Sequence, residues 1–180
     1  ASSAHFVEGA ILSAVGEAGA KASILVAGER AEAFARRMNQ LGLVNVKYFS
    51  PEVGEASQMK MLRSIFSKGV ECLLLEMLVA GKRAGIAEYL WKDIVDFMTK
   101  HPFQGIAENW IKTHPAASER RYHEMEQVLE TLKELGVDPV MTRGTTEFFR
   151  QSVESELASR FTRKPDDVWA VPEELEKRRR

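Results

Sequence analysis

Three polar side chains on a predicted long helix have types and spacing that suit proton transfer. Lys60, Ser64 and Ser67 are separated by four and three positions, which places them on one face of a helix. Lys60 stands between Met59 and Met61 in an apolar stretch. A lysine shielded from water gives up its proton more readily than a solvated one. The alternative, which the pattern alone favours, is a lysine that extends from an amphipathic helix into solvent.

The segment before that helix has the pattern of a small α/β sheet. We expect strands and a helix in the order β, β, α, β over His5–Leu12, Ala22–Ala27, Arg30–Leu41 and Asn45–Phe49. The glycine-containing stretch 16–21 is expected to be a loop, and Gly28 and Gly42 to end the second strand and the helix. This order is typical of the closing part of an α/β sheet rather than of a complete nucleotide-binding domain.

The sequence after Pro51 is predicted to be helical. Nothing breaks the helical pattern from Gly54 to Ala84 except two tolerated glycines, Gly69 and Gly81. Further helices are predicted over Ala87–Lys100, Pro102–Thr113, Ala116–Leu135 and Thr142–Arg160. Prolines mark several of these boundaries, because the residue before a proline avoids the helical conformation. The predicted organisation is therefore an α/β segment over residues 1–52, a helical domain over 53–162, and a polar tail over 163–180.

Composition excludes several classes of protein. The chain of 180 residues has a formal net charge of −1, so no global positive field draws it to nucleic acid or to an anionic membrane. Its longest apolar run is too short to cross a bilayer, which takes about 20 residues. The single Cys72 lies in an apolar run, is expected to be buried, and cannot form a disulfide within the chain. We therefore expect a soluble protein of the reducing cytoplasm.

Two stretches together resemble a known family. The strand Phe6-Val7-Glu8-Gly9-Ala10 is followed by Gly54 and then by Lys60 six residues later on the long helix. These features resemble the C-terminal part of the β-hydroxyacid dehydrogenase and 6-phosphogluconate dehydrogenase superfamily. The stretch 54–85 looks closest to the subgroup with a 6-phosphogluconate dehydrogenase-like C-terminal domain. The resemblance implies closing strands of a Rossmann-type sheet over 1–52, a long interdomain helix, and an all-helical C-terminal domain.

The resemblance also implies roles for individual residues. Lys60 occupies the place of the lysine that moves the hydroxyl proton, so it is the expected catalytic acid/base. Ser64 stands where the family has an asparagine that orients substrate, and Ser13 lies one position from the serine that helps to hold the acid group. Ser67 replaces the glutamate that serves as the acid in oxidative decarboxylation, so simple oxidoreduction is favoured. The expected substrate-binding residues are Ser13, Ser64 and Ser67.

The implied cofactor is NAD or NADP, but its fingerprint is missing. A dinucleotide site needs Gly-x-Gly-x-x-Gly between a strand and a helix, and no such run occurs in the chain. The resemblance thus implies an NAD(P)-dependent oxidoreductase acting on a hydroxyacid or related small acidic substrate, in a homodimer. The alternative is a non-catalytic helical dimerisation or binding module of the same fold.

A basic and aromatic cluster near the start of another predicted helix is the remaining candidate site. It consists of His114, Arg120, Arg121, Tyr122 and His123. Such a cluster could contact a substrate carboxylate, but an ordinary solvated surface is the favoured interpretation. The four histidines lack a tight ligand spacing, so no metal site is expected.

Overall fold

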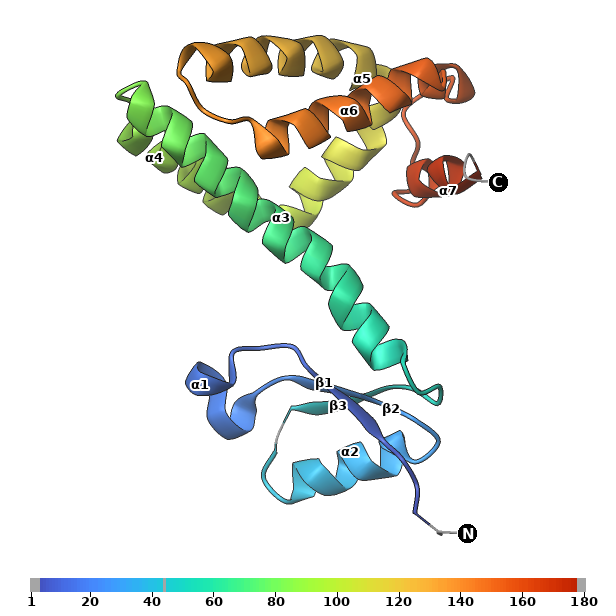
Figure 1. The fold of residues 1–180 in the computed structure, drawn as a ribbon. Coiled ribbons are helices and arrows are strands. Elements are labelled where there is room, and N and C mark those ends of the chain that lie inside the picture. Colours follow the sequence, from blue (N-terminus) through green and yellow to red (C-terminus); the bar gives the residue numbers. More distant parts are fainter. Residues whose placement is uncertain (1–3, 44, 178–180) are drawn as a thin grey trace. The chain divides into compact units, whose positions relative to one another are not determined.

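The computed structural model describes residues 4–43 and 45–177, which divide into the compact units Ala1–Val70 and Glu71–Arg180 (Figure 1). The first unit holds a small sheet and its helices, and the second consists of helices. The predicted fold class, an α/β segment followed by a mostly helical one, is therefore confirmed. The predicted boundary after residue 52 lies just before the long helix α3, whereas the two units divide inside that helix.

The sheet of the first unit contains β1 (Glu8–Ile11), β2 (Ile24–Ala27) and β3 (Val46–Ser50) in that spatial order. β1 runs antiparallel to β2, and β2 runs parallel to β3. The central β2 is covered on both faces because successive side chains point to opposite sides of a strand. Val26 packs with Ala31 and Ala35 of α2 (Ala31–Gln40). On the other face, Leu25 and Ala27 pack against Ala56 of α3, which is fully buried.

One short segment of the first unit differs from its prediction. The stretch expected to be a loop forms one turn of α-helix, α1 (Val15–Ala18), and one 3₁₀ turn, η1 (Gly19–Lys21). These single turns satisfy backbone groups locally but bury no side chain. The expected stops at Gly28 and Gly42 are confirmed, since both have positive φ angles, of 127° and 102°.

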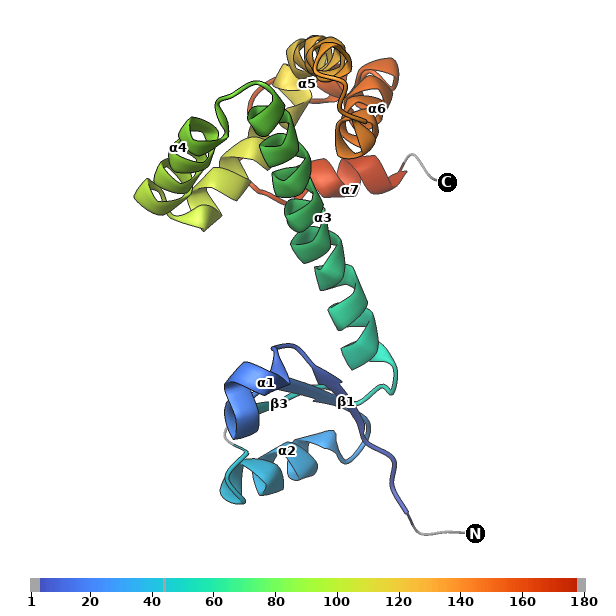
Figure 2. The same ribbon diagram turned by 60° about the vertical axis from the view of Figure 1, so that its left-hand side comes forward.

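The long helix α3 spans Glu55–Arg83, within one residue of its predicted bounds at each end. The helical part of the second unit continues with α4 (Ala87–Lys100), α5 (Phe103–Glu134), α6 (Val140–Glu154), η2 (Leu157–Arg160) and α7 (Ala170–Glu176). In both ribbon views α6 lies alongside the second half of α5 (Figure 2). At the end of α3, Arg83 donates to the carbonyls of Leu135 and Gly136, which closes the C-terminal end of α5.

The predicted break at Pro115 is wrong, because α5 continues through this residue as one helix. A proline inside a helix removes one backbone hydrogen bond and bends the helix. The ribbon changes direction between the yellow and the brown parts of α5 (Figure 1). Ser118 donates to the Pro115 carbonyl, and Pro115 itself is buried, so packing in the second unit holds the bent helix together.

Two expectations about burial also differ from the structure. Cys72 is exposed rather than buried, because its apolar run lies on a helix that is covered on only part of its circumference. The segment expected to be a polar tail carries α7, whose Val171 is only 2% exposed and which packs against α5. Within the described part of the chain, no helix is long and apolar enough to cross a membrane.

Candidate active site around Lys60

The carboxylate of Glu8 in β1 holds the start of α3. It accepts hydrogen bonds from the amide of Gly54, at 2.6 Å, and from the amide of Ser57, at 3.0 Å. These amides belong to the first turn of the helix, where N–H groups have no partner inside the helix. The hydrogen bond from the Ser57 hydroxyl and those from the backbone amides lower the pKa of Glu8, although desolvation opposes them. Glu8 thereby fixes where α3 begins relative to the sheet of the same unit.

Lys60 lies one helical turn after the buried Ala56, on the same side of α3. Its side chain is half-buried. One further turn along, Ser64 is also half-buried, and its hydroxyl donates to the Lys60 carbonyl at 2.9 Å. Ser64 therefore uses its only hydroxyl proton inside the helix and presents acceptor lone pairs outward. Lys60 and Ser64 thus sit at the edge of the contact between α3 and the sheet.

The end of β1 is tied to the same part of α3. Arg63 donates to the carbonyl of Leu12 at 3.1 Å, and Ser13 is the next residue along the chain. The Ser13 hydroxyl oxygen accepts a hydrogen bond from the amide of Ser23 at 2.9 Å, so its own proton remains available for donation. Ser67 is exposed on α3, two turns after Lys60. The first unit therefore brings Ser13 toward the lysine-bearing part of α3, while Ser67 lies farther along the helix.

Two residues that organise this region had no role in the sequence-based prediction. In the sequence alone, Glu8 is one more residue of a predicted strand, and Arg63 is one more charged residue on an amphipathic helix. Their partners are 46 to 51 residues away in the chain, so no local spacing reveals them. The only signal for Glu8 was its place in the strand that carries the family resemblance.

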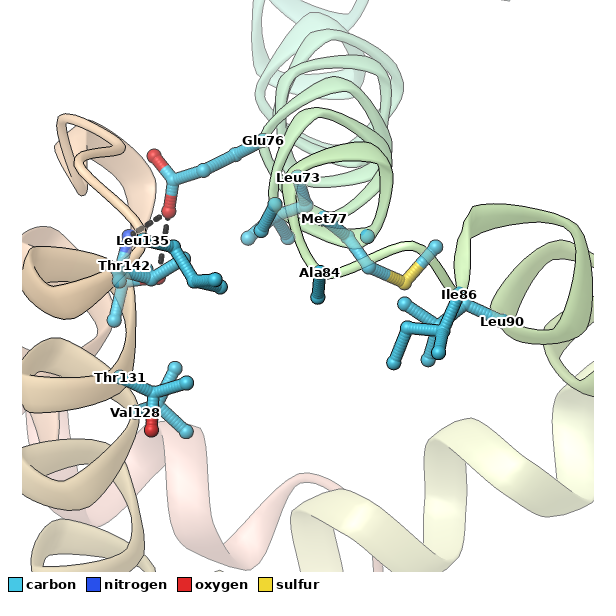
Figure 3. A pocket seen from close by; sticks show the side chains of 13 residues that line it. Leu73, Glu76, Met77, Ala84, Ile86, Leu90, Val128, Thr131, Leu135 and Thr142 are labelled. Carbon is cyan, nitrogen blue, oxygen red and sulfur yellow. Dashed lines mark hydrogen bonds between the residues drawn. The ribbon is translucent and has the colours of Figure 1, made fainter.

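A cavity of about 330 Å³ lies entirely in the second unit, between α3, α4, α5 and the start of α6. Figure 3 shows Met77, Ile86, Leu90 and Val128 around it, so its walls are apolar. The one carboxylate at its rim, Glu76, turns to Thr142 instead of into the cavity (Figure 3). The cavity has room for an apolar group but carries no proton-transfer residue.

The basic and aromatic cluster is only partly on the surface. Arg120 and His123 are exposed and pair with Glu124 and Glu126, as expected for a solvated face. His114 is buried, however, and Arg121 is half-buried. The expectation of a surface position is wrong for these two residues, because the bend of α5 and the packing of α6 enclose them.

Known proteins resemble this chain in sequence and in fold. Residues 82–152 match the family described as a domain of unknown function, DUF1932. A reductive aminase from Aspergillus terreus, solved with NADPH and ethyl levulinate, has a TM-score of 0.68 at 16% identity, over 95% of this chain and 61% of that one. An imine reductase from Myxococcus stipitatus, solved with NADP+, has a TM-score of 0.68 at 17% identity, over 87% and 63%.

The chain carries a DUF1932 match within the fold of the imine reductases. The predicted resemblance to the C-terminal part of the hydroxyacid dehydrogenase superfamily is confirmed at the level of the fold. An uncharacterised protein from Methanothermus fervidus is 26% identical over 107 residues, which are 59% of this chain and 42% of that protein. The chain spans less than two thirds of the length of each of these three relatives.

The turn after β2 lacks the glycines of a pyrophosphate-binding turn. The parallel unit β2–α2–β3 is the place where such a group would bind, at the turn after the first strand. That turn contains only one glycine, Gly28, followed by Glu29. A Cβ atom at Gly28 would lie 2.9 Å from the carbonyl oxygen of Phe6, so this glycine allows the backbone to pack against its own unit.

Proposed function

We propose that this chain is the substrate-binding part of an NAD(P)-dependent oxidoreductase that acts on a hydroxyacid or a related small polar acid. The observation that carries the proposal is the position of Lys60, half-buried on the side of α3 that packs on the sheet, with Ser64 one turn away. The similarity in fold to NADPH- and NADP+-bound reductases supports the same class of reaction.

Each proposed residue has a task that its hydrogen bonds permit. Lys60 takes the hydroxyl proton of the substrate during oxidation and returns it during reduction. Ser64, whose own proton is used inside the helix, accepts a hydrogen bond from a second hydroxyl group of the substrate, and Ser13 donates its free proton to the substrate's carboxylate. Ser67, which is exposed, offers a further hydrogen bond to a longer substrate. The role of these side chains is to orient the reacting groups.

The cofactor in this proposal is NAD or NADP, which supplies hydride transfer. It is bound by residues beyond those described, since no pyrophosphate cradle forms at Gly28. The reductive aminase that shares this fold was solved with NADPH, and the imine reductase with NADP+. This chain covers 61% and 63% of those two proteins, which leaves room for a nucleotide-binding part in a longer polypeptide.

The proposed assembly is a homodimer. On α3, the stretch Leu62, Ile65 and Phe66 is 59%, 72% and 56% exposed. At 100° per residue these side chains lie about 120–160° around the helix from Lys60. An exposed apolar stripe of this kind marks a protein interface. A second copy of the chain that covers it would leave the lysine side open to substrate.

The proposal is tested by turnover in the full polypeptide that carries this chain. NADPH and NADH formation is followed at 340 nm with a panel of small hydroxyacids. Lys60→Ala is expected to reduce the rate about 10²- to 10⁴-fold, because it removes the proton-transfer group. Lys60→Arg keeps the positive charge but cannot deprotonate, so a comparable loss is expected.

The matched control is Lys82→Ala, which removes an exposed lysine at the other end of the same helix and should leave the rate unchanged. Circular dichroism verifies that each variant keeps its helices. Full activity in Lys60→Arg would exclude Lys60 as the acid/base. An absence of turnover and of nucleotide binding in the full polypeptide, together with a stable dimer, would favour the non-catalytic dimerisation or binding module instead.

A further inference from the structure

A groove in the second unit lies between α5, α6 and α7 and has a volume of about 670 Å³. We call it the α5–α7 groove. Its walls are largely apolar and include Trp110, Phe148, Phe149, Val171, Pro172 and Leu175. Volumes of several hundred Å³ with apolar walls and a few polar groups are typical of small-molecule sites. The groove is contained in one unit and does not depend on the proposed role of Lys60.

Arg121 is the charged group of this groove. Its guanidinium donates to the Thr113 hydroxyl at 2.8 Å and, with a longer contact of 3.4 Å, to the Trp110 carbonyl. A guanidinium has five N–H donors, so several remain for another acceptor. Over residues 4–43 and 45–177, Arg121 forms no salt bridge, although the charge of Glu124 acts on it from nearby. The nearby Glu124 is instead paired with Arg120.

Burial makes the absence of a salt bridge to Arg121 costly. Desolvation lowers the pKa of Arg121 and the charge of Arg120 lowers it further, while the charge of Glu124 opposes both, and the group stays protonated. A half-buried charge that forms no salt bridge is stabilised by an anion that reaches it. Binding of an anion would offset the desolvation cost of holding Arg121 in this position.

His114, which lines the groove, is held in place by Ser152. His114 lies 3.0 Å from the Ser152 hydroxyl through Nε2, and that hydroxyl donates to the Phe148 carbonyl. Since the serine has one proton, the imidazole Nε2 must be the donor. The ring of His114 contacts the rings of Phe148 and Phe149, with centroids 5.8 and 5.4 Å apart. These contacts fix the positions of the side chains that line this part of the groove.

We propose that the α5–α7 groove binds a small organic carboxylate with an aliphatic or aromatic body. The carboxylate pairs with the guanidinium of Arg121, and the body lies against the aromatic and aliphatic walls from α6 and α7. An arginine at the side of an apolar groove selects a ligand with one negative end and an apolar remainder. Inorganic anions lack the body, and neutral apolar molecules lack the charge.

The test uses octanoate, octanol and acetate as probes on the full polypeptide that carries this chain. Binding is measured by isothermal titration calorimetry, and the indole N–H signal of Trp110 reports occupancy of the groove. Octanoate is expected to bind about ten-fold or more tightly than octanol, and acetate to show no saturable binding. Arg121→Gln should weaken octanoate binding at least about ten-fold, which corresponds to roughly 1.4 kcal/mol.

Arg120→Gln is the matched control, because it removes the neighbouring arginine, which is exposed and paired with Glu124. It should leave octanoate binding within about two-fold of the unmodified chain. Equal weakening by the two variants, or equal binding of octanol and octanoate, would overturn the proposal. A Trp110 signal that responds to protein concentration and not to octanoate would overturn it in favour of a second copy of the chain. If Arg121→Gln does not fold, the comparison of octanoate with octanol decides.

Discussion

Glu76 of α3 accepts hydrogen bonds from both the amide and the hydroxyl of Thr142, at 2.9 and 2.5 Å, at the start of α6. Its other oxygen accepts the Met141 amide at 2.7 Å. α6 has no side-chain cap of its own at Pro139, so a carboxylate from another helix takes that place. Glu8 does the same for α3 in the first unit. In each unit an acidic side chain distant in sequence determines where a helix begins.

We predict that Glu76→Gln destabilises the second unit by about 1–3 kcal/mol, because a neutral amide replaces charged acceptors of three hydrogen bonds. The midpoint of urea unfolding, followed by circular dichroism, measures the effect. Glu88→Gln in the first turn of α4 is the control, since Glu88 is exposed, and should change stability by less than about 0.5 kcal/mol. Equal midpoints for the two variants would exclude Glu76 as the cap of α6.

The pH dependence of stability should follow the same carboxylate. Desolvation raises the pKa of Glu76, but the hydrogen bonds from Thr142 and Met141 outweigh it, so the pKa lies below its ordinary value of 4.5. A carboxylate with a lowered pKa in the folded state stabilises the protein above the unfolded pKa and loses that contribution as pH falls through the folded one.

We therefore expect the unmodified chain to lose stability as pH falls below 4.5. The difference between it and Glu76→Gln should shrink over the same window. Urea midpoints collected at successive pH values provide the measurement. A difference that stays constant from neutral pH down to the acid limit would show that the Glu76 carboxylate is not responsible.

Two glycines on α3 should respond in opposite directions to replacement by alanine. At Gly81 a Cβ atom would lie 2.8 Å from the Leu90 side chain and 3.1 Å from the Ala87 Cα, so Gly81→Ala should cost about 1–3 kcal/mol. At Gly69 a Cβ atom meets nothing within 4 Å, so Gly69→Ala should stabilise the helix by about 0.5–1 kcal/mol. Thermal unfolding compares the two variants. Stabilisation by both would mean that α4 does not pack on Gly81.

The exposed apolar stripe of α3 should control assembly. Ile65→Glu places a charge at its most exposed member and should convert the proposed dimer to a monomer, measured by light scattering after gel filtration. Lys82→Glu changes the charge of an exposed residue outside the stripe and should leave the molar mass unchanged. An unmodified chain that is monomeric at all concentrations would refute this interface.

Local periodicity predicted most helices and strands, but it did not predict which of their faces are buried. β2, α2, β3, α3 and α4 lie within two residues of their predicted bounds, because apolar spacing and glycine stops act over a few residues. Pro115 was misjudged, since packing around a buried proline offsets a lost hydrogen bond. Cys72 was misjudged because a helical pattern does not say which side of the helix finds a neighbour.

The candidate site was likewise predicted only in part. Spacing on a helix placed Lys60, Ser64 and Ser67 together, and the family resemblance supplied their proposed roles. Only the folded chain brought Arg63 to Leu12 and Glu8 to the start of α3, because those contacts join residues far apart in sequence. In the sequence alone, Arg121 is only one of several neighbouring charged residues. Its half-burial without a salt bridge arises only when α6 and α7 pack against α5, since desolvation is a property of the packed structure.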